Sequence, residues 1–328
     1  MRPGGKQIKG VSYAKYGYLF SIPFVLAFLV FSLYPTLYTA LIGFTDLKGV
    51  ATTSFKVLDD PFANFTAIFN NATFQKSFRN TLTIWIINFI PQLSLAMLLA
   101  YWFTGRNRRI RGQGAFKVMF YMPNIITAAT VAVLFAALFA YPIGPINSLL
   151  RTTGLVREPY YFTNSPWASK LIVAFIQFWQ WYGYTTIILI SGVLGVNPEL
   201  FESAEIDGAS QGQTFLRITL PCIRTILLFT LITSLIGGLN MFDIPKMFNN
   251  GAPVNETMTT SVFIFAQAFS GTYQYNRAAA ASMIMFLIIV ALSAIVFYLM
   301  RDRYASRENK LERKAQRALR KARKEAAA

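Results

Sequence analysis

Six long apolar segments govern what this 328-residue chain can fold into. Each is near or above the roughly 20 residues that an α-helix needs to cross about 30 Å of hydrocarbon. A backbone inside lipid must satisfy its own hydrogen bonds, so these segments are expected to be helices. The sequence therefore predicts an all-α integral membrane protein with six transmembrane helices, at 17–41, 82–103, 116–140, 170–194, 224–246 and 278–300.

The composition agrees with a membrane location and excludes several kinds of site. Hydrophobic residues make up 54% of the chain, and charged residues make up 14%, against about 25% in ordinary soluble domains. The chain has no histidine and a single cysteine, Cys222. His-based acid–base catalysis, Cys/His zinc sites and internal disulfides are therefore excluded. We expect no catalytic residue and no metal site.

The uneven distribution of positive charge predicts the orientation in the membrane. The net charge is +17, and 22 of the 31 Lys and Arg residues fall in segments that share one side if the six spans alternate. The positive-inside rule places that side, with both termini, in the cytoplasm. We therefore divide the chain into a cytoplasmic N-terminal segment (1–16), a six-helix domain (17–300) and a basic cytoplasmic tail (301–328). Because the positive charges lie at the predicted membrane edges, they are better explained by the orientation of the chain in the membrane than by nucleic-acid binding.

The loop between the fourth and fifth spans, residues 197–221, has the most specific local pattern. Asn197 is a good N-cap residue, and Pro198 suits the first position of a helix. Gly208 permits a sharp change of direction, and a second helix is expected over 209–219. The sequence predicts an L-shaped pair of short helices on the cytoplasmic side, which we call the bracket.

The bracket resembles the "EAA" signature of ATP-binding-cassette (ABC) importer permeases, through Glu202-Ser203-Ala204, Gly208 and Ile218-x-Leu220-Pro221. In that family, which has the type I importer permease fold, the segment is a coupling helix that docks into a cleft on a separate ATPase. Phe215 and Ile218 would then hold the second arm against the bundle. The resemblance implies that the ATPase contact is formed by Glu202, Ser203, Ala204, Asp207, Gly208 and Ala209.

The chain has no Gly-x-x-x-x-Gly-Lys-Ser/Thr phosphate loop. It is therefore expected to bind no cofactor and to catalyse no hydrolysis itself. By the resemblance, ATP and Mg would be bound by the partner ATPase.

Other motifs resemble the carbohydrate-uptake branch of these permeases, and in particular the F-type subunits of maltose and multiple-sugar transporters. They include Tyr121-Met122-Pro123, Trp181-Tyr182-Gly183 and Asn250-Gly251-Ala252-Pro253. The resemblance implies a prokaryotic inner-membrane protein that imports sugars, and oligosaccharides in particular, by alternating access. Its implied partners are a second homologous permease, two ABC ATPase subunits, an extracytoplasmic solute-binding protein and a saccharide.

Sugar chemistry and the resemblance together select candidate substrate residues. Sugars present hydroxyl groups and apolar C–H faces, so their sites combine aromatic rings with amides and hydroxyls. The candidates in the fourth and fifth spans are Trp179, Gln180, Trp181, Gly183, Tyr184, Ser234, Gly238, Asn240 and Met241. Gly237 and Gly238 stand where the resembling subunit has larger residues. They predict either a wider cavity or close helix packing.

Three alternatives remain open. An ion-coupled secondary transporter would use Asp243, since an acidic residue in a membrane span is a functional candidate by default. Lys246 would otherwise pair with Asp243 at the membrane interface. An ABC importer for another polar solute, such as glycerol phosphate, is the second alternative. A membrane scaffold that recruits an ATPase for another purpose is the third.

Overall fold

The computed structural model describes residues 14–50, 52, 54–105, 110–271 and 273–300. Within them, the regular structure is helical apart from one isolated antiparallel bridge between Thr45 and Val57, so the predicted all-α class is confirmed there. The chain forms two units, residues 1–69 with 267–284, and residues 70–266 with 285–328. Residues 1–13 of the predicted N-terminal segment and the whole basic tail lie outside the described residues.

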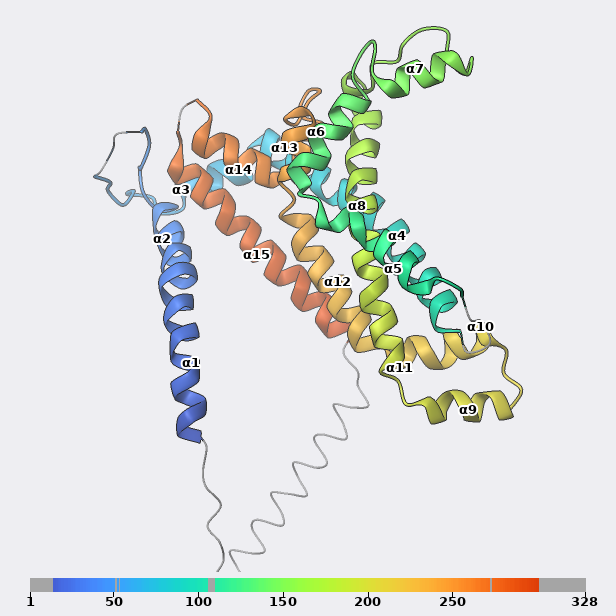
Figure 1. The fold of residues 1–328 in the computed structure, drawn as a ribbon. Coiled ribbons are helices and arrows are strands. Elements are labelled where there is room, and N and C mark those ends of the chain that lie inside the picture. Colours follow the sequence, from blue (N-terminus) through green and yellow to red (C-terminus); the bar gives the residue numbers. More distant parts are fainter. Residues whose placement is uncertain (1–13, 51, 53, 106–109, 272, 301–328) are drawn as a thin grey trace, which may run out of the picture. The chain divides into compact units, whose positions relative to one another are not determined.

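The first unit opens with a long apolar helix in three parts (Figure 1): α1 (Ala14–Phe28), the π-helical turn η1 (Leu29–Leu33) and α2 (Tyr34–Ile42). Its side chains are exposed along nearly its whole length, and only Ile42 is buried. Apolar side chains that stay exposed over this length are expected to face lipid or another subunit.

Asn64 organises the rest of the first unit. It lies buried in α3 (Ala63–Phe69). Its amide nitrogen donates to the carbonyl oxygens of Gly43 and Thr45, at 2.9 and 2.8 Å. Its side-chain oxygen accepts a 3.1 Å hydrogen bond from Asn276, which lies in the first turn of α15 (Tyr275–Met300). These bonds hold the end of α2, α3 and the start of α15 together.

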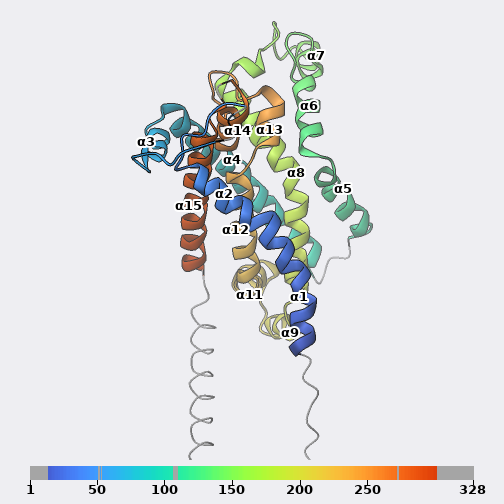
Figure 2. The same ribbon diagram turned by 90° about the vertical axis from the view of Figure 1, so that its left-hand side faces the viewer.

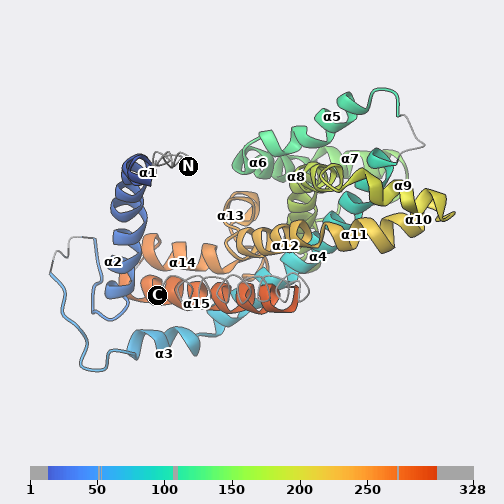
Figure 3. The ribbon, with the colours of Figure 1, turned by 90° about the horizontal axis from the view of Figure 1, so that it is seen from below.

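The second unit contains most of the remaining helices, and the long helices α4 and α8 run side by side through its centre (Figure 3). Helices α5 and α12 pack along α8, and α12 also contacts α4. The elements are α4 (Ala72–Thr104), α5 (Gln113–Ile125), α6 (Ala128–Leu138), α7 (Pro145–Thr152), η2 (Phe162–Asn164), α8 (Pro166–Leu194), α9 (Pro198–Ile206), α10 (Gln211–Thr214), η3 (Phe215–Thr219), α11 (Leu220–Cys222), α12 (Arg224–Leu239), α13 (Asp243–Asn249) and α14 (Thr260–Phe269), whose last residues belong to the first unit.

Two apolar clusters hold the second unit together. One joins α4, α6, α8 and α13 through buried residues such as Ile84, Val131, Ile176 and Ile244. The other joins the later turns of α4 and α8 to the residues before α12, with Ala96, Ala100, Leu189 and Ile223 among its buried members. The small alanines of α4 allow α4 and α8 to approach closely at this end, as is common between membrane helices.

The membrane-spanning helices differ from the six predicted spans in their continuity. The predicted third span is divided between α5 and α6, and the predicted fifth span, 224–246, contains the end of α12 at Leu239 and the start of α13 at Asp243. Four helices are long and apolar enough to cross a membrane: Lys15–Ile42, Ala72–Thr104, Arg224–Asn249 and Tyr275–Met300. The other two candidates are bent pairs, α5 with α6 at 89° (Figure 2) and α8 with α9 at 74°. The described residues therefore provide four to six spans.

The predicted third span, 116–140, is broken because a new helix starts inside it. Residues Ile126 and Thr127 are extended, and the Thr127 hydroxyl accepts a 3.3 Å hydrogen bond from the backbone N–H of Thr130. This is an ordinary N-cap. The average hydropathy of 116–140 is high enough to predict one span, although Pro123, Asn124 and Thr127 mark the break locally.

Candidate functional site

The bracket folds as its capping residues predict, at one end of the second unit (Figure 1). The side chain of Asn197 accepts a 3.1 Å hydrogen bond from the backbone N–H of Glu199 and caps α9. Gly208 has φ +76°, which glycine adopts without strain. Ser210 and Gln213 then form a reciprocal capping box at the start of α10, which satisfies two backbone N–H groups at the beginning of the second arm.

The second arm of the bracket packs back onto the bundle. The Phe215 ring contacts the Tyr101 ring of α4 edge to face, with centroids 5.2 Å apart, so the packing predicted for Phe215 is present. Ile218 is half-buried, and Thr219 is buried. The bracket and the ends of α4 and α8 line an open cavity of about 320 Å³, with Glu205 among the lining residues.

The residues predicted for the ATPase contact differ in exposure. Glu202, Ser203, Asp207 and Gly208 are exposed, and Ala209 is half-buried. Ala204 is buried, and its carbonyl oxygen accepts a 2.9 Å hydrogen bond from the Ala209 N–H. Ala204 therefore supports the turn of the bracket from inside.

Ile206 is a surface residue of the bracket that the sequence reasoning missed. Its side chain is 87% exposed, and it lies one helical turn after Glu202, so the two share one face of α9. Single exposed apolar side chains are common on protein surfaces, so what makes Ile206 a candidate contact is its place on the same face of α9 as Glu202. Its spacing from Glu202 was a signal available in the sequence.

A second cavity, of about 270 Å³, lies among α4, α8 and α12. Each helix lines it with one face, because the lining residues recur at spacings of three, four or seven. No charged side chain lines it. Its polar and aromatic walls include Trp85, Asn88 and Gln92 of α4, Gln177, Trp181, Tyr184 and Thr185 of α8, and Thr230, Thr233, Ser234, Gly237 and Gly238 of α12.

Four of the nine candidate substrate residues line this cavity: Trp181, Tyr184, Ser234 and Gly238. Two others on α8 face elsewhere. Trp179 packs against the first apolar cluster, with its ring 5.8 Å from that of Phe135. Gln180 is buried and donates a 2.9 Å hydrogen bond to the Ile126 carbonyl oxygen, so it binds the extended break between α5 and α6.

The remaining three candidates also lie outside the cavity. Gly183 is a packing position, since a Cβ there would lie 1.8 Å from the backbone oxygen of Phe120 in α5. Asn240 caps the end of α12, where its amide donates to Ile236 at 2.9 Å. Met241 is buried in the first apolar cluster.

The sequence predicted either a wider cavity or close helix packing at Gly237 and Gly238, and each glycine fulfils one of these roles. A Cβ on Gly238 would lie 2.1 Å from Cδ1 of Trp85, so Gly238 serves close packing. A Cβ on Gly237 would meet nothing within 4 Å, and this glycine does leave the cavity wider. The α4 wall of Trp85, Asn88 and Gln92 was missed, although these residues form a polar and aromatic stripe at i, i+3 and i+7 in an otherwise apolar span.

Asp243 and Lys246 do not form the ion pair expected of them. Asp243 is exposed in the first turn of α13, where a carboxylate complements the helix dipole. Lys246 instead donates a 2.7 Å hydrogen bond to Asn250, and its ammonium lies 4.8 Å from the ring centre of Phe265. The Phe265 ring and the Asn250 amide together stabilise the Lys246 ammonium group, so it has favourable contacts without an ion pair to Asp243. Asp243 lines neither of the two cavities described above.

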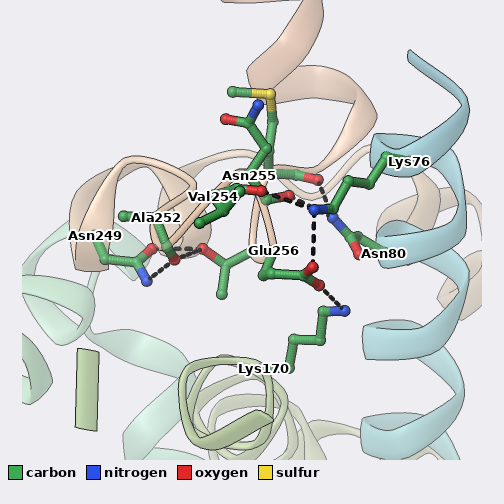
Figure 4. Close-up of polar contacts among 10 residues, drawn as sticks. Lys76, Asn80, Lys170, Asn249, Ala252, Val254, Asn255 and Glu256 are labelled. Atoms are coloured by element: carbon green, nitrogen blue, oxygen red, sulfur yellow. Dashed lines mark hydrogen bonds and ion pairs between the residues drawn. The ribbon is translucent and has the colours of Figure 1, made fainter. Parts of the chain in front are cut away.

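A cluster that the sequence did not predict fixes the loop between α13 and α14 (Figure 4). One Glu256 carboxylate oxygen lies 2.8 Å from Nζ of Lys76 on α4, and the other is paired with Lys170 on α8. Lys76 also donates to the Val254 carbonyl oxygen at 2.8 Å, and Asn80 donates to that of Asn255 at 2.7 Å. Hydrogen bonds from Lys170 and Lys76 hold the pKa of Glu256 below its ordinary value.

The chain matches the family described as binding-protein-dependent transport system inner membrane component over residues 61–310. It is 27% identical to the lactose transport system permease protein LacF of Rhizobium radiobacter, over 88% of this chain and 94% of that protein. It is 30% identical to the diacetylchitobiose uptake system permease protein NgcF of Streptomyces coelicolor, over 82% of this chain and 78% of that protein.

A solved structure has the same fold. It is a chain of a bacterial ABC transporter involved in the import of the acidic polysaccharide alginate, with a TM-score of 0.73 and 23% identity over 88% of this chain and 96% of that one. The likeness supports the type I importer permease fold expected from the bracket. With the family match over most of its length, the chain belongs to the binding-protein-dependent transport system inner membrane components.

Proposed function

We propose that this chain is the permease subunit of an ATP-driven importer of uncharged oligosaccharides. Family membership makes it a transport subunit. Relatives that match most of its length are named for lactose, arabinooligosaccharide and diacetylchitobiose transport. The observation that carries the proposal is the cavity among α4, α8 and α12, which combines aromatic rings with amides and hydroxyls, as saccharide sites do.

The absence of charge in that cavity favours a neutral saccharide over an anion. A phosphate ester or an acidic sugar bound away from water needs cationic side chains or several backbone N–H groups. None of the residues that line the cavity is Lys or Arg. Glycerol phosphate is therefore the weaker substrate candidate.

The bracket supports coupling to a partner ATPase. With six spans and both termini in the cytoplasm, the acidic face of α9 lies where an ATPase would meet it. Closure of two ATPase subunits on ATP would move the brackets of this chain and of a second permease together. The cavity would then change from inward-open to outward-open as a rigid-body transition. An extracytoplasmic solute-binding protein would deliver the sugar, in the inner membrane of a prokaryotic cell.

Two substitutions separate this proposal from an ion-coupled transporter. In the assembled importer, Glu202→Lys reverses a charge on the exposed face of the bracket and should abolish ATP-driven uptake. Asp243→Asn should leave uptake within about twofold, because Asp243 is exposed and lines neither cavity described here. Glu158→Lys makes the same charge change at an exposed outer-loop position and serves as the matched control.

Uptake of labelled saccharide into proteoliposomes, with and without ATP, measures both effects. Uptake that needs no ATP, tolerates Glu202→Lys and is lost in Asp243→Asn would establish the ion-coupled alternative. An ATPase that binds the bracket but shows no substrate-stimulated turnover would support the scaffold reading.

A further inference from the structure

Trp85 is held in one position by contacts from two helices. Its indole N–H donates a 3.2 Å hydrogen bond to the Ser234 hydroxyl of α12. Its ring stacks on Phe89, with centroids 5.4 Å apart and planes 13° from parallel. The side chain occupies the space that Gly238 leaves open, since any Cβ at Gly238 would clash with it. The indole is therefore a preformed surface.

The indole borders the cavity as well as the protein interior. Trp85 is half-buried and is one of the lining residues of the 270 Å³ cavity. Trp181 and Tyr184 line the same cavity from α8, with their rings edge to face at 5.6 Å. Aromatic surfaces on two of the three helices thus line one cavity, and such surfaces suit the C–H faces of a sugar ring.

Two amides follow Trp85 along the same face of α4. The Asn88 amide nitrogen donates to the Ile84 carbonyl oxygen at 3.0 Å, and the Gln92 amide nitrogen donates to the Thr185 hydroxyl at 2.7 Å. Each bond uses the N–H side of the amide and fixes its rotation. Among the described residues, neither side-chain oxygen accepts a hydrogen bond, so both are available to hydroxyl donors in the cavity.

We infer that Trp85 is a stacking platform for one ring of the transported saccharide, with the Asn88 and Gln92 oxygens accepting hydrogen bonds from its hydroxyl groups. The Gly238–Trp85 contact determines where this platform lies and therefore which sugars fit. The inference rests on the proposed function and adds a binding wall on α4, where the sequence placed binding residues only on the fourth and fifth spans.

Equilibrium binding of radiolabelled saccharide to the assembled importer, with the solute-binding protein removed, tests this directly. The probes are lactose, diacetylchitobiose and arabinotriose, and the one that the wild-type importer takes up with ATP is carried forward. Trp85→Leu keeps apolar volume against Gly238 but removes the aromatic face, and it should weaken binding by about two- to tenfold. Trp85→Phe keeps a ring and should recover most of the loss.

Gly238→Ala provides an independent second variant, because the added methyl group displaces the indole without changing it. It should weaken binding in the same direction and change the order of preference among the three sugars. Trp102→Ala is the matched control, since Trp102 lies on the same helix, is exposed and lines neither cavity described here. It should bind saccharide as the wild type does.

The outcomes separate the inference from the function beneath it. A wild-type importer that takes up none of the three sugars with ATP overturns the proposed function, and this inference falls with it. A wild-type importer that takes one up, while Trp85→Leu and Gly238→Ala bind that sugar as tightly with unchanged preference, overturns the inference alone. Equal losses in Trp85→Phe and Trp85→Leu would also overturn it, because an aromatic face would then not matter.

Discussion

Gly183 shows how a single atom controls the approach of two helices. Its hydrogen faces the backbone of α5, where a Cβ would lie 1.8 Å from the Phe120 oxygen and 2.4 Å from its carbonyl carbon. Backbone atoms cannot move aside as a flexible side chain can, so an added methyl group must separate α5 from α8.

Gly183→Ala should therefore lower the free energy of unfolding by about 1–3 kcal/mol or more, seen as a lower melting temperature of the purified chain in detergent. Gly114→Ala is the matched control. It lies in α5, and a Cβ there meets nothing within 4 Å, so it should be neutral or slightly stabilising. Equal melting of the two variants would contradict the close contact between α5 and α8.

Glu256 makes the loop between α13 and α14 sensitive to pH in a defined direction. Because its two lysine partners favour the charged form, its pKa in the folded protein lies below the unfolded value of about 4.3. The stabilisation is complete above that unfolded value and is lost as the pH falls through the lower folded-state pKa.

Glu256→Gln should lower the free energy of unfolding at pH 7 by about 1.5–3 kcal/mol, the usual contribution of hydrogen bonds to charged groups. The difference from wild type should shrink toward zero as the pH falls below about 4. Melting curves of the two proteins between pH 7 and pH 3 measure this. Glu158→Gln, at an exposed carboxylate in the loop after α7, is the control. A difference that stays constant with pH would show that the ion pairs contribute nothing.

At the scale of elements, the bracket presents both charge and an apolar anchor on α9. Burying one isoleucine side chain at a partner surface contributes about 1.5–3 kcal/mol. Ile206 is 87% exposed in this chain, so this contribution would appear only when the partner binds.

Ile206→Ala should weaken recovery of the ATPase with the purified chain by about tenfold or more while leaving the chain's own melting temperature unchanged. Leu155→Ala is a control of similar exposure in the loop after α7, predicted to lie on the other side of the membrane. Quantitative mass spectrometry of the co-purified ATPase gives the ratio. Undiminished recovery from Ile206→Ala would mean that the apolar tip of the bracket does not meet the ATPase.

The elements also show where sequence reasoning succeeds. The bracket was predictable because Asn197, Pro198 and Gly208 act through local capping and turn geometry. The break between α5 and α6 was not predicted, because the high average hydropathy of 116–140 outweighs the local signals of Pro123, Asn124 and Thr127. The α4 wall could have been found from the spacing of its polar residues. The Glu256 cluster could not, because Lys76, Lys170 and Glu256 meet only after the chain has folded.

At the scale of the whole molecule, α8 connects the features that the proposed function needs. Its first turns include Lys170 of the Glu256 cluster, its middle turns line the cavity among α4, α8 and α12, and its last residues precede the bracket. From Trp181 to Leu194 the helix rises by about 20 Å. Because α8 is continuous over this distance, it would move as a rigid body. A displacement of the bracket would therefore also displace the α8 wall of the cavity.

The most direct test of the account is to purify the tagged chain from its native membranes in mild detergent and to identify what accompanies it by mass spectrometry. The account predicts a second six-span permease and an ATPase that has the phosphate-binding loop this chain lacks. Recovery of the chain alone, together with a saccharide transport activity that does not depend on ATP, would contradict it.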